Sequence, residues 1–166
     1  RVIGTSGDDT IYGNSYGNVF IGGAGNDTID AREGNDTLYG ISGNNKLYGG
    51  SENDTIYGGT GNDTLDGGAG DDILDGKAGD DLIYGGDGND QIFGGTGKDV
   101  LYGEDGLDII FAEGDDDTIY GGAGNDQLNG GLGIDTIYAG DGDDIITFVQ
   151  ADNSTDIVYG GDATAD

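Results

Sequence analysis

A nine-residue repeat runs without a gap from residue 4 to residue 147 and occurs sixteen times. Its consensus is G-G-x-G-x-D-x-U-x, where U is a large apolar residue, and residues 22–30 (GGAGNDTID) match it at every defined place. A self-similar period of this kind is typical of solenoids, in which each repeat packs on its neighbours. The chain is therefore expected to form a stack of small units around a narrow core.

Each unit divides into a stretch that favours a turn and a stretch that favours a strand. In residues 58–66 (GGTGNDTLD), the first six places carry three glycines and Asn62, which tolerate the positive φ of tight turns. Asn or Asp holds the fifth place in 12 of 16 units, which we attribute to the same tolerance. The last three places alternate outward, inward and outward, as a short strand does. We expect a turn of six residues followed by a strand of three.

Two such units complete one coil of the solenoid, with one strand on each side. The predicted fold is therefore all-β, with two parallel sheets of short strands, odd-numbered units in one sheet and even-numbered units in the other. One apolar residue per unit, at the eighth place, is expected to point into the core. In the odd-numbered units these residues are Ile11, Ile29, Leu47, Leu65, Ile83, Leu101, Ile119 and Ile137. In the even-numbered units they are Phe20, Leu38, Ile56, Leu74, Ile92, Ile110, Leu128 and Ile146.

Composition alone points the other way, towards disorder. The chain has 39 glycines, 33% hydrophobic residues and a formal charge of −29, and low hydrophobicity with high net charge is the signature of a disordered segment. However, 35 of the 39 glycines fall at the first, second or fourth place of the repeat. A flexible linker has no need of such registry, so we expect an ordered fold.

The charge indicates a cation as the partner. Thirty-four carboxylates against five basic side chains repel one another in a compact state. Nucleic acid is excluded as a partner because its phosphates require basic patches, and an anionic membrane surface is disfavoured for the same reason. One inward apolar residue per unit cannot by itself offset the ordering of so many glycines. Positive charge among the aspartates is therefore needed for folding.

The absence of cysteine and histidine narrows the chemistry further. Disulfides, thiolate metal sites and a Ser-His-Asp triad all require residues that the chain lacks. A uniform repeat also offers no single pocket in which two carboxylates take different roles, so we expect a non-catalytic module. No apolar stretch reaches membrane-span length and no signal peptide opens the chain, which we expect to be a piece of a longer protein.

The sixth place of the repeat supplies the candidate metal ligands. Each turn is expected to lie over the turn two units later, so that Asp63 stacks over Asp81 and Asp72 over Asp90. Carboxylates with turn carbonyls form an all-oxygen site, which suits calcium better than magnesium, zinc or copper. The predicted carboxylate ligands are Asp9, Asp27, Asp36, Asp54, Asp63, Asp72, Asp81, Asp90, Asp99, Asp108, Asp117, Asp126, Asp135 and Asp144.

The number of turns limits the number of ions. Eight turns on each side leave seven gaps per side, so the chain is expected to bind at most about fourteen calcium ions. Fourteen divalent ions neutralise a charge of the same order as the chain's own. Asn18 and Asn45 replace the sixth-place aspartate, so calcium should bind more weakly in the gaps beside them. Glu52, Asp115 and Tyr16 replace the fourth-place glycine and are expected to strain their turns.

The repeat resembles the RTX (repeat-in-toxin) nonapeptide calcium-binding family over residues 4–147. The resemblance implies a parallel β-roll in which calcium is held by the sixth-place aspartates and by backbone carbonyls of the glycine turns. The best-matched carbonyl donors are those of Gly59, Gly61, Gly68, Gly70, Gly86, Gly88, Gly95, Gly97, Gly122, Gly124, Gly131 and Gly133.

The resemblance also implies a cellular setting. Proteins of this family are secreted from Gram-negative bacteria by a one-step, type I exporter. They remain unfolded where calcium is scarce and fold outside the cell, where it is plentiful. The export signal lies at the extreme C-terminus of such proteins, and we expect this chain to lack it.

The repeat loses its register after Thr147. Twelve residues instead of nine separate Asp144 from Asp156, and Phe148, Val149 and Gln150 interrupt the glycine turn. We therefore divide the chain into a β-roll at 1–147 and an irregular segment with a partial repeat at 148–166. That segment is either a cap on the end of the solenoid or a junction to further repeats.

Tyrosine at the ninth place forms an outward stripe. The stripe consists of Tyr12, Tyr48, Tyr84, Tyr102, Tyr120 and Tyr138 on one sheet, and Tyr39 and Tyr57 on the other. Packing of strand-favouring residues along a sheet face explains it better than a platform for a sugar or a protein.

Two functions remain open. The first is a calcium-binding folding module of a secreted toxin, protease, lipase, epimerase or adhesin. The second is a building block of a surface layer or extracellular fibre that self-associates through its rod ends or tyrosine faces.

Overall fold

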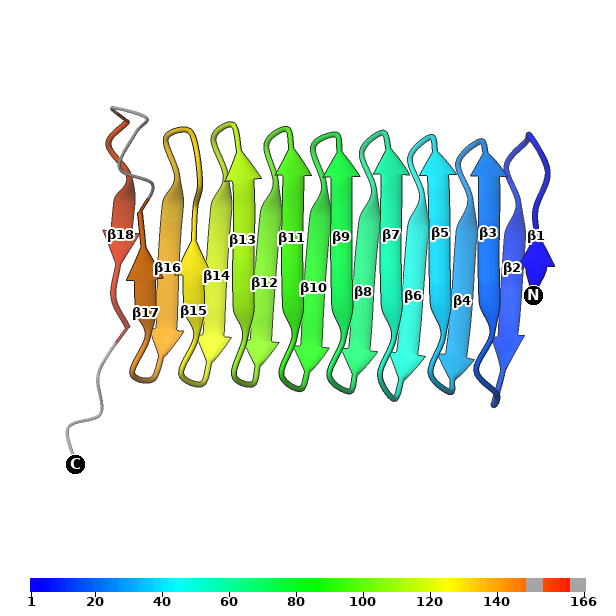
Figure 1. Cartoon of the computed structure of the whole chain (residues 1–166), viewed down its shortest axis with the longest axis horizontal. Helices are drawn as coiled ribbons and strands as arrows, with labels where there is room; N and C mark the ends of the chain where they lie inside the picture. The colour runs from blue at the N-terminus through cyan, green and yellow to red at the C-terminus, as the bar shows by residue number, and fades with distance from the viewer. Residues whose placement is uncertain (149–153, 162–166) are drawn as a thin grey trace.

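The structure, a computed structural model, describes residues 1–148 and 154–161 and contains only strands and turns there. Eighteen strands wind into a solenoid whose successive strands alternate between two nine-stranded parallel sheets (Figure 1). The β1 sheet contains β1 (Val2–Ile3), β3 (Val19–Ala24), β5 (Thr37–Ser42), β7 (Thr55–Thr60), β9 (Ile73–Ala78), β11 (Gln91–Thr96), β13 (Ile109–Gly114), β15 (Gln127–Asn129) and β17 (Ile145–Thr147). The β2 sheet contains β2 (Thr10–Asn14), β4 (Thr28–Glu33), β6 (Lys46–Ser51), β8 (Thr64–Ala69), β10 (Leu82–Asp87), β12 (Val100–Asp105), β14 (Thr118–Ala123), β16 (Thr136–Asp141) and β18 (Ile157–Tyr159).

The pairing register equals two repeat units. Within the β2 sheet, Leu65 lies opposite Ile83 and Ile83 opposite Leu101, each eighteen residues further along the chain. Each place of the repeat is therefore aligned with the same place in the next coil and forms a file along the rod. The predicted all-β fold, with two parallel sheets and two nonapeptide units per coil, is confirmed. No helix in the described residues is long and apolar enough to cross a membrane.

The strands are longer than the sequence pattern predicted. A typical strand such as β7 has six residues, covering places seven to nine of one unit and one to three of the next. The prediction of a three-residue strand was wrong because the in-and-out alternation continues across the unit boundary. Gly58 is buried, and Gly59 pairs with Ile41 on one side and Lys77 on the other. The turn is thereby reduced to places four to six.

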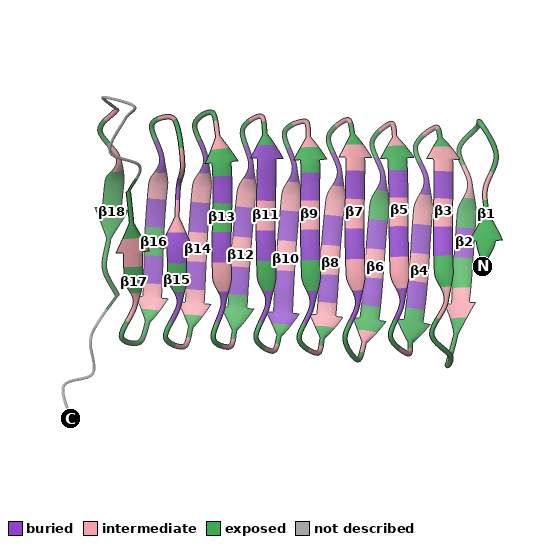
Figure 2. Ribbon diagram, viewed as in Figure 1, coloured by how far each residue is buried: buried purple, intermediate pink, exposed green. Residues whose placement is uncertain are grey.

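The core consists of one file of large apolar side chains from each sheet and runs the length of the rod. Eighth-place residues from Ile11 to Ile137 are buried as predicted, and Ile146 is partly buried against the same cluster. Buried and less buried residues alternate along most of the strands between β2 and β16 (Figure 2). The sequence analysis missed a second contribution to the core, made at the first place by Ala31, Ala112 and Ala139.

Left-handed backbone recurs at the second and fourth places, as at Gly59 (φ 116°) and Gly61 (φ 112°). Glu52 (φ 70°) and Asp115 (φ 79°) take the same conformation, so their expected strain is located there. Tyr16 is not among the positive-φ residues of the described chain, and neither is any fifth-place Asn or Asp. The prediction that Asn and Asp are preferred at the fifth place because they adopt a left-handed backbone conformation was therefore wrong. Other non-glycine residues in this conformation, all at the second place, are Arg32, Ile41, Lys77, Glu104 and Glu113.

The irregular segment returns to the roll. Strand β18 pairs in parallel with β16, with Ile157 opposite Thr136 and Val158 opposite Ile137. The offset along the chain is 21 residues rather than 18, because three extra residues precede the strand. The interruption at Val149 and Gln150 lies outside the described residues, as do 151–153 and 162–166.

Candidate metal centres in the turns

The turns form two rows along opposite edges of the rod (Figure 1). The Asp63 row leads into strands of the β2 sheet and the Asp54 row into strands of the β1 sheet. Sixth-place residues of the Asp63 row are Asp9, Asp27, Asn45, Asp63, Asp81, Asp99, Asp117 and Asp135, followed by Asp156. Those of the Asp54 row are Asn18, Asp36, Asp54, Asp72, Asp90, Asp108, Asp126 and Asp144.

From Asp27 onward, one oxygen of each sixth-place carboxylate accepts a backbone N–H of the preceding coil. The backbone N–H of Asp63 donates to Oδ1 of Asp81 at 2.7 Å, and that of Asp72 donates to Oδ1 of Asp90 at 2.8 Å. The predicted stacking of these residues is thus confirmed. The file continues beyond the regular repeats, since the N–H of Asp135 donates to Oδ1 of Asp156 at 3.1 Å.

In most of the described carboxylates the other oxygen, Oδ2, is buried and has no hydrogen-bond partner. Within the part of the chain that the structure describes, this atom lacks a hydrogen-bond partner in Asp27, Asp36, Asp54, Asp63, Asp72, Asp81, Asp90, Asp99, Asp108, Asp117 and Asp126. These side chains are at most 2% exposed. Leaving a charged group buried and unpaired is among the most costly arrangements in a protein. Asp9 and Asp144, near the ends of the rows, are half-buried.

These oxygens lie beside the first-place glycine of their own unit. A Cβ added at Gly58 would lie 2.6 Å from Oδ2 of Asp63 and 2.8 Å from the carbonyl oxygen of Gly76 in the next coil. A Cβ added at Gly94 would likewise lie 2.6 Å from Oδ2 of Asp99. Carboxylate and carbonyl oxygens thus converge where a larger side chain would stand, and only Gly or Ala occupies the first place in all sixteen units.

Burial also raises the pKa of these carboxyls. The pKa of Asp54, Asp81 and Asp90 is raised to about 7, and that of Asp117 to about 8, with desolvation as the largest cause. Neighbouring carboxylates of the same row, such as Asp99 beside Asp81, raise the pKa further, whereas the N–H donated to Oδ1 opposes the change. Burial raises the pKa to about 6 in Asp63, Asp72, Asp99 and Asp108, and raises it in Asp27, Asp36 and Asp126.

The carbonyl groups predicted as ligands form files of their own. The carbonyl oxygens of Gly61 and Gly68 lie against the α-carbons of Gly79 and Gly86, their counterparts in the following coil. The carbonyls of Gly70, Gly88, Gly122 and Gly124 are placed in the same way. Gly61, Gly70, Gly88 and Gly124 lie on the same turns as the aspartates, whereas Gly68 and Gly122 lie near the end of a strand. In eight of the units with a buried sixth-place aspartate, the structure brings the carbonyl of a first-place residue of the next coil beside Oδ2, a group that the sequence analysis did not single out. These units contain Asp54, Asp63, Asp72, Asp81, Asp90, Asp99, Asp108 and Asp126.

Asn45 shows what an amide does in this file. Its Oδ1 accepts the N–H of Asp27 at 3.0 Å, as an aspartate would. Its Nδ2 donates to Oδ1 of Asp63 at 2.9 Å and to the carbonyl of Gly43 at 3.1 Å. Asn45 therefore satisfies by hydrogen bonds the position where an aspartate leaves a bare anionic oxygen.

A second ladder of hydrogen bonds joins the fifth-place residues. Its direction is opposite to that of the sixth-place bonds, because the backbone N–H of each coil donates to a side chain of the preceding coil. Oδ1 of Asn44 accepts the N–H of Asn62 at 3.1 Å, and Oδ1 of Asn62 accepts the N–H of Asp80 at 3.1 Å. In the Asp54 row, the N–H of Asp71 likewise donates to Oδ1 of Asn53, and the N–H of Asn89 donates to Oδ1 of Asp71. The preference for Asn and Asp at the fifth place is thus explained by a bond to the next coil. The only sign of this bond in the sequence was that fifth-place Asn and Asp residues recur eighteen residues apart.

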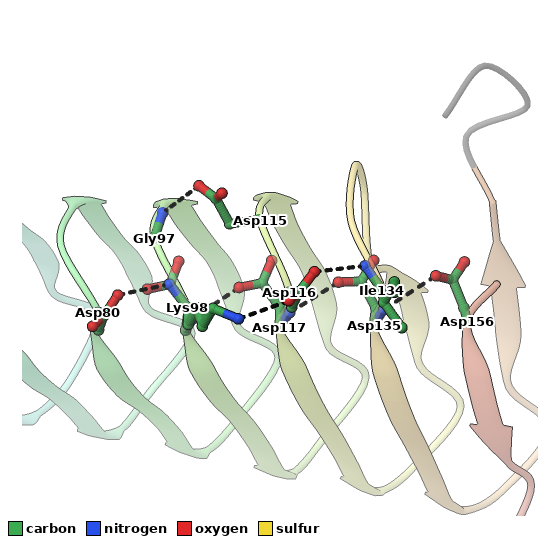
Figure 3. A network of polar contacts seen from close by, with 10 residues as sticks. Asp80, Gly97, Lys98, Asp115, Asp116, Asp117, Ile134, Asp135 and Asp156 are labelled. Carbon is green, nitrogen blue, oxygen red and sulfur yellow. Dashed lines mark hydrogen bonds and ion pairs between the residues drawn. The ribbon is translucent and has the colours of Figure 1, made fainter. Parts of the chain in front are cut away.

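Figure 3 shows the part of the Asp63 row in which this ladder is interrupted, at Lys98. The backbone N–H of Lys98 donates to Oδ1 of Asp80 at 2.9 Å, but the Lys98 side chain has no oxygen to accept an N–H from the next coil. Its Nζ instead pairs with Asp116 Oδ2 at 2.7 Å, and this contact lowers the pKa of Asp116. Asp115, at the fourth place, accepts the N–H of Gly97 at 3.1 Å.

The donor set suits a hard cation. It consists of carboxylate and carbonyl oxygens only, with unpaired buried anions in both rows. In the described residues no three His, Cys, Asp or Glu side chains converge on one point, so each turn contributes a single sixth-place carboxylate. A cation between turns would therefore draw its other ligands from the backbone. The residues present fit calcium on these grounds.

Comparison with known proteins agrees. The model of the RTX calcium-binding nonapeptide repeat (4 copies) matches residues 3–38, 39–74, 66–101, 93–128, 102–137, 120–148 and 129–163. No curated protein matches the chain significantly. Repeats of this family are typical of secreted bacterial proteins, and their β-roll is a structural and typically non-catalytic fold. The matches cover nearly the whole chain, which therefore belongs to the RTX calcium-binding nonapeptide repeat family and is a calcium-binding module with a parallel β-roll fold.

Proposed function

We propose that this module is a folding switch operated by calcium. The ligands are the sixth-place carboxylates of both turn rows, together with the backbone carbonyls of the second- and fourth-place glycines. Calcium supplies two positive charges per ion and accepts six to eight oxygen ligands in a flexible arrangement. The chain's own contribution is to hold Oδ1 of each aspartate on a backbone N–H and to leave Oδ2 available.

The single observation behind this proposal is the file of buried, unpaired Oδ2 atoms in both rows. Desolvation makes each of these anions unfavourable, and the carboxylates of the same row repel one another. The same groups that oppose folding in the absence of a cation therefore favour it when a cation is present. Stability becomes a function of the calcium concentration, as linkage requires when a ligand binds only the folded state.

The switch suits export to the outside of a bacterial cell. We infer that the chain stays unfolded in the cytoplasm, where calcium is scarce, passes through a type I exporter and folds outside. Once folded, the roll stabilises the protein to which it belongs. The module itself is non-catalytic, and any activity of the parent resides in other domains.

Circular dichroism of the 166-residue chain tests the switch. With a calcium chelator we expect the spectrum of a disordered chain, and with calcium the spectrum of a β protein, reached cooperatively as the concentration rises. Magnesium at the same concentration should be far less effective, since it prefers a strict octahedron. A β spectrum that survives the chelator unchanged would contradict the proposal.

We further propose that residues 1–147 are the β-roll proper and that 148–166 are a cap or junction containing a partial repeat. The pairing of β18 with β16 and the bond from Asp135 to Asp156 support a continuation of the roll. Removal of 148–166 should raise the calcium concentration needed for folding, because β16 then loses β18, its neighbour at the end of the sheet. An unchanged midpoint would argue against this role.

A second candidate function is a building block of a surface layer or fibre, which self-associates through the rod ends. The end strands β1 and β17 of the β1 sheet each pair on one side only. Light scattering on addition of calcium distinguishes the two functions, since open-ended polymerisation is expected only of the building block.

A further inference from the structure

One part of the outer surface is free of charge. The seventh and ninth places of β10, β12, β14, β16 and β18 face outward and carry Leu82, Tyr84, Val100, Tyr102, Thr118, Tyr120, Thr136, Tyr138, Ile157 and Tyr159. We call these ten residues the tyrosine face. The same places in β2 to β8 include Asp30, Lys46 and Asp66. In a chain with a formal charge of −29, the acids thus lie beside the tyrosine face but not on it.

The five tyrosines form one continuous stack. Ring centroids are 4.9 Å apart from Tyr84 to Tyr102, 4.6 Å from Tyr102 to Tyr120, 4.8 Å from Tyr120 to Tyr138 and 4.7 Å from Tyr138 to Tyr159. The rings are tilted by at most 10° from one another. Each inner ring is therefore held on both sides, so it loses little conformational freedom when a partner covers it.

This stacking excludes the usual way of binding a sugar. A sugar lies on the flat face of an aromatic ring, but both faces of Tyr102, Tyr120 and Tyr138 are covered by neighbouring rings. What the stack offers to solvent is a ridge of ring edges and hydroxyl groups. Beside it runs a parallel file of Leu82, Val100 and threonines at the seventh place.

We propose that the tyrosine face binds the tyrosine face of a second copy of this chain, giving a two-fold symmetric dimer of folded rolls. Its composition is that of the centre of a protein interface, rich in tyrosine and without Lys, Glu or Asp. Two flat sheets pack well face to face, and a two-fold axis sets the same patch against itself. No carboxylate of either copy has to be buried in such a contact, because the ten residues of the tyrosine face include none.

The size of the face sets the strength of the contact. Five strands at about 4.8 Å each, and about 12 Å across, give a footprint on the order of 300 Å² per copy. This is below the ~800 Å² per partner of a standard interface, so the dimer should be weak and transient. Glu104 borders the face, and its pKa is raised by burial and by Asp66, Asp87 and Asp105. This acidic rim should make the dimer tighter, not weaker, when monovalent salt screens it.

The β1 sheet is the competing surface and is less suited. Its aromatic file is broken into two pairs, Tyr39 with Tyr57 and Phe93 with Phe111. Between the pairs stand Asp75 and its ion-pair partner Lys77. The uncharged stretch from β11 to β17 therefore has a stack of two rings, against five on the tyrosine face.

Sedimentation velocity in saturating calcium, from about 10 μM to 1 mM, tests the proposal, with circular dichroism to verify folding. The inference requires the folded roll, so a chain that fails to fold is detected separately from one that folds but stays monomeric. The wild-type mass should rise from 16.8 kDa towards twice that value. The test variant is Thr118→Lys, which sets two like charges against each other across the two-fold axis. Lys46 already stands at the same place of the repeat in β6, so a lysine is tolerated there.

Two matched controls keep the outcome decisive. Thr28→Lys adds the same charge at the same place of the same sheet, outside the tyrosine face, and Gln127→Lys adds it on the β1 sheet. We expect Thr118→Lys to fold but remain monomeric, while both controls dimerise like the wild type. A folded wild type that stays monomeric at 1 mM would overturn the proposal. So would loss of the dimer in Gln127→Lys alone, or open-ended polymers unaffected by Thr118→Lys, which would indicate the rod ends.

Discussion

The two oxygens of a sixth-place carboxylate have opposite surroundings. In Asp81, Oδ1 accepts the N–H of Asp63 at 2.7 Å, while Oδ2 is buried without a partner in the described structure. The first oxygen holds the turn to the preceding coil, and the second carries the unfavourable energy of a buried anion. Asn45 separates the two roles, since it retains the acceptor and replaces the anionic oxygen by a donor.

Asp81→Asn should therefore preserve the turn and weaken calcium binding. The amide oxygen still accepts the N–H of Asp63, but one negative ligand is lost. We expect the calcium midpoint of folding, followed by circular dichroism, to rise by up to about tenfold, equivalent to ~1.4 kcal/mol. Asp87→Asn is the control, because it removes one charge from an exposed third-place residue. Equal midpoints for the two variants would rule out sixth-place ligation.

The reverse change, Asn45→Asp, should lower the midpoint. It restores the anionic oxygen in the one gap of the Asp63 row where an amide donates to Asp63 and Gly43. The same titration measures it. A midpoint that stays the same or rises would show that this gap binds no calcium in either form.

The raised pKa values predict how the metal-free chain responds to pH. Asp54, Asp81 and Asp117 have an ordinary pKa of 3.8 when unfolded and about 7 to 8 in the roll. Their contribution to stability is therefore fully present below pH 3.8 and is lost as the pH rises through 7 to 8. Circular dichroism without calcium should show more β structure at pH 4 than at pH 8, with a transition near neutrality. A roll that is more stable at pH 8 would contradict this sign.

At the scale of the strand and turn, two hydrogen-bond ladders of opposite direction join each coil to the next. The fifth-place ladder of the Asp63 row is continuous from Asp8 to Lys98. It stops there, because lysine has no oxygen to offer Asp116. In the Asp54 row the ladder reaches Leu107 and stops for the same reason. Both interruptions fall between the same two coils, where the sheets and the core continue without a break.

The plane between these coils should be the weakest in the roll. Leu107→Asn, at an exposed position, provides an oxygen for the N–H of Asn125 and should stabilise the calcium-loaded roll by about 0.5–1.5 kcal/mol. Urea unfolding measures the gain. Leu132→Asn is the control, since Leu132 is equally exposed but stands at the third place, outside the ladder. A similar gain in both variants would mean that removing an exposed leucine, not restoring the ladder, is the cause.

At the scale of the whole molecule, charge is segregated. The sixth-place acids lie in the two turn rows, whereas most of both sheet faces is uncharged. Cations bound along the rows therefore act on the groups that most oppose compaction. This arrangement lets a chain of charge −29 fold around a narrow core that has only one large apolar residue per repeat unit.

The number of ions bound follows from the same arrangement. Native mass spectrometry of the calcium-loaded chain should show about fourteen bound ions, one for each gap between successive turns of the sixteen units. Excess chelator should remove the ions and the β signal together. A count near two or three would contradict ligation along the whole length of both rows.

The sequence by itself determined the period, the eighth-place core, the two-sheet solenoid and the sixth-place carboxylates. It did so because a register error in any unit would accumulate over sixteen tandem copies, which leaves one consistent arrangement. Only the tertiary structure decided the six-residue strands, the first-place carbonyl of the next coil beside Oδ2, the fifth-place ladder and the return of β18 after a three-residue insertion. Each of these depends on a neighbour one coil away, eighteen or more residues distant, and local conformational preference contains no information about that contact.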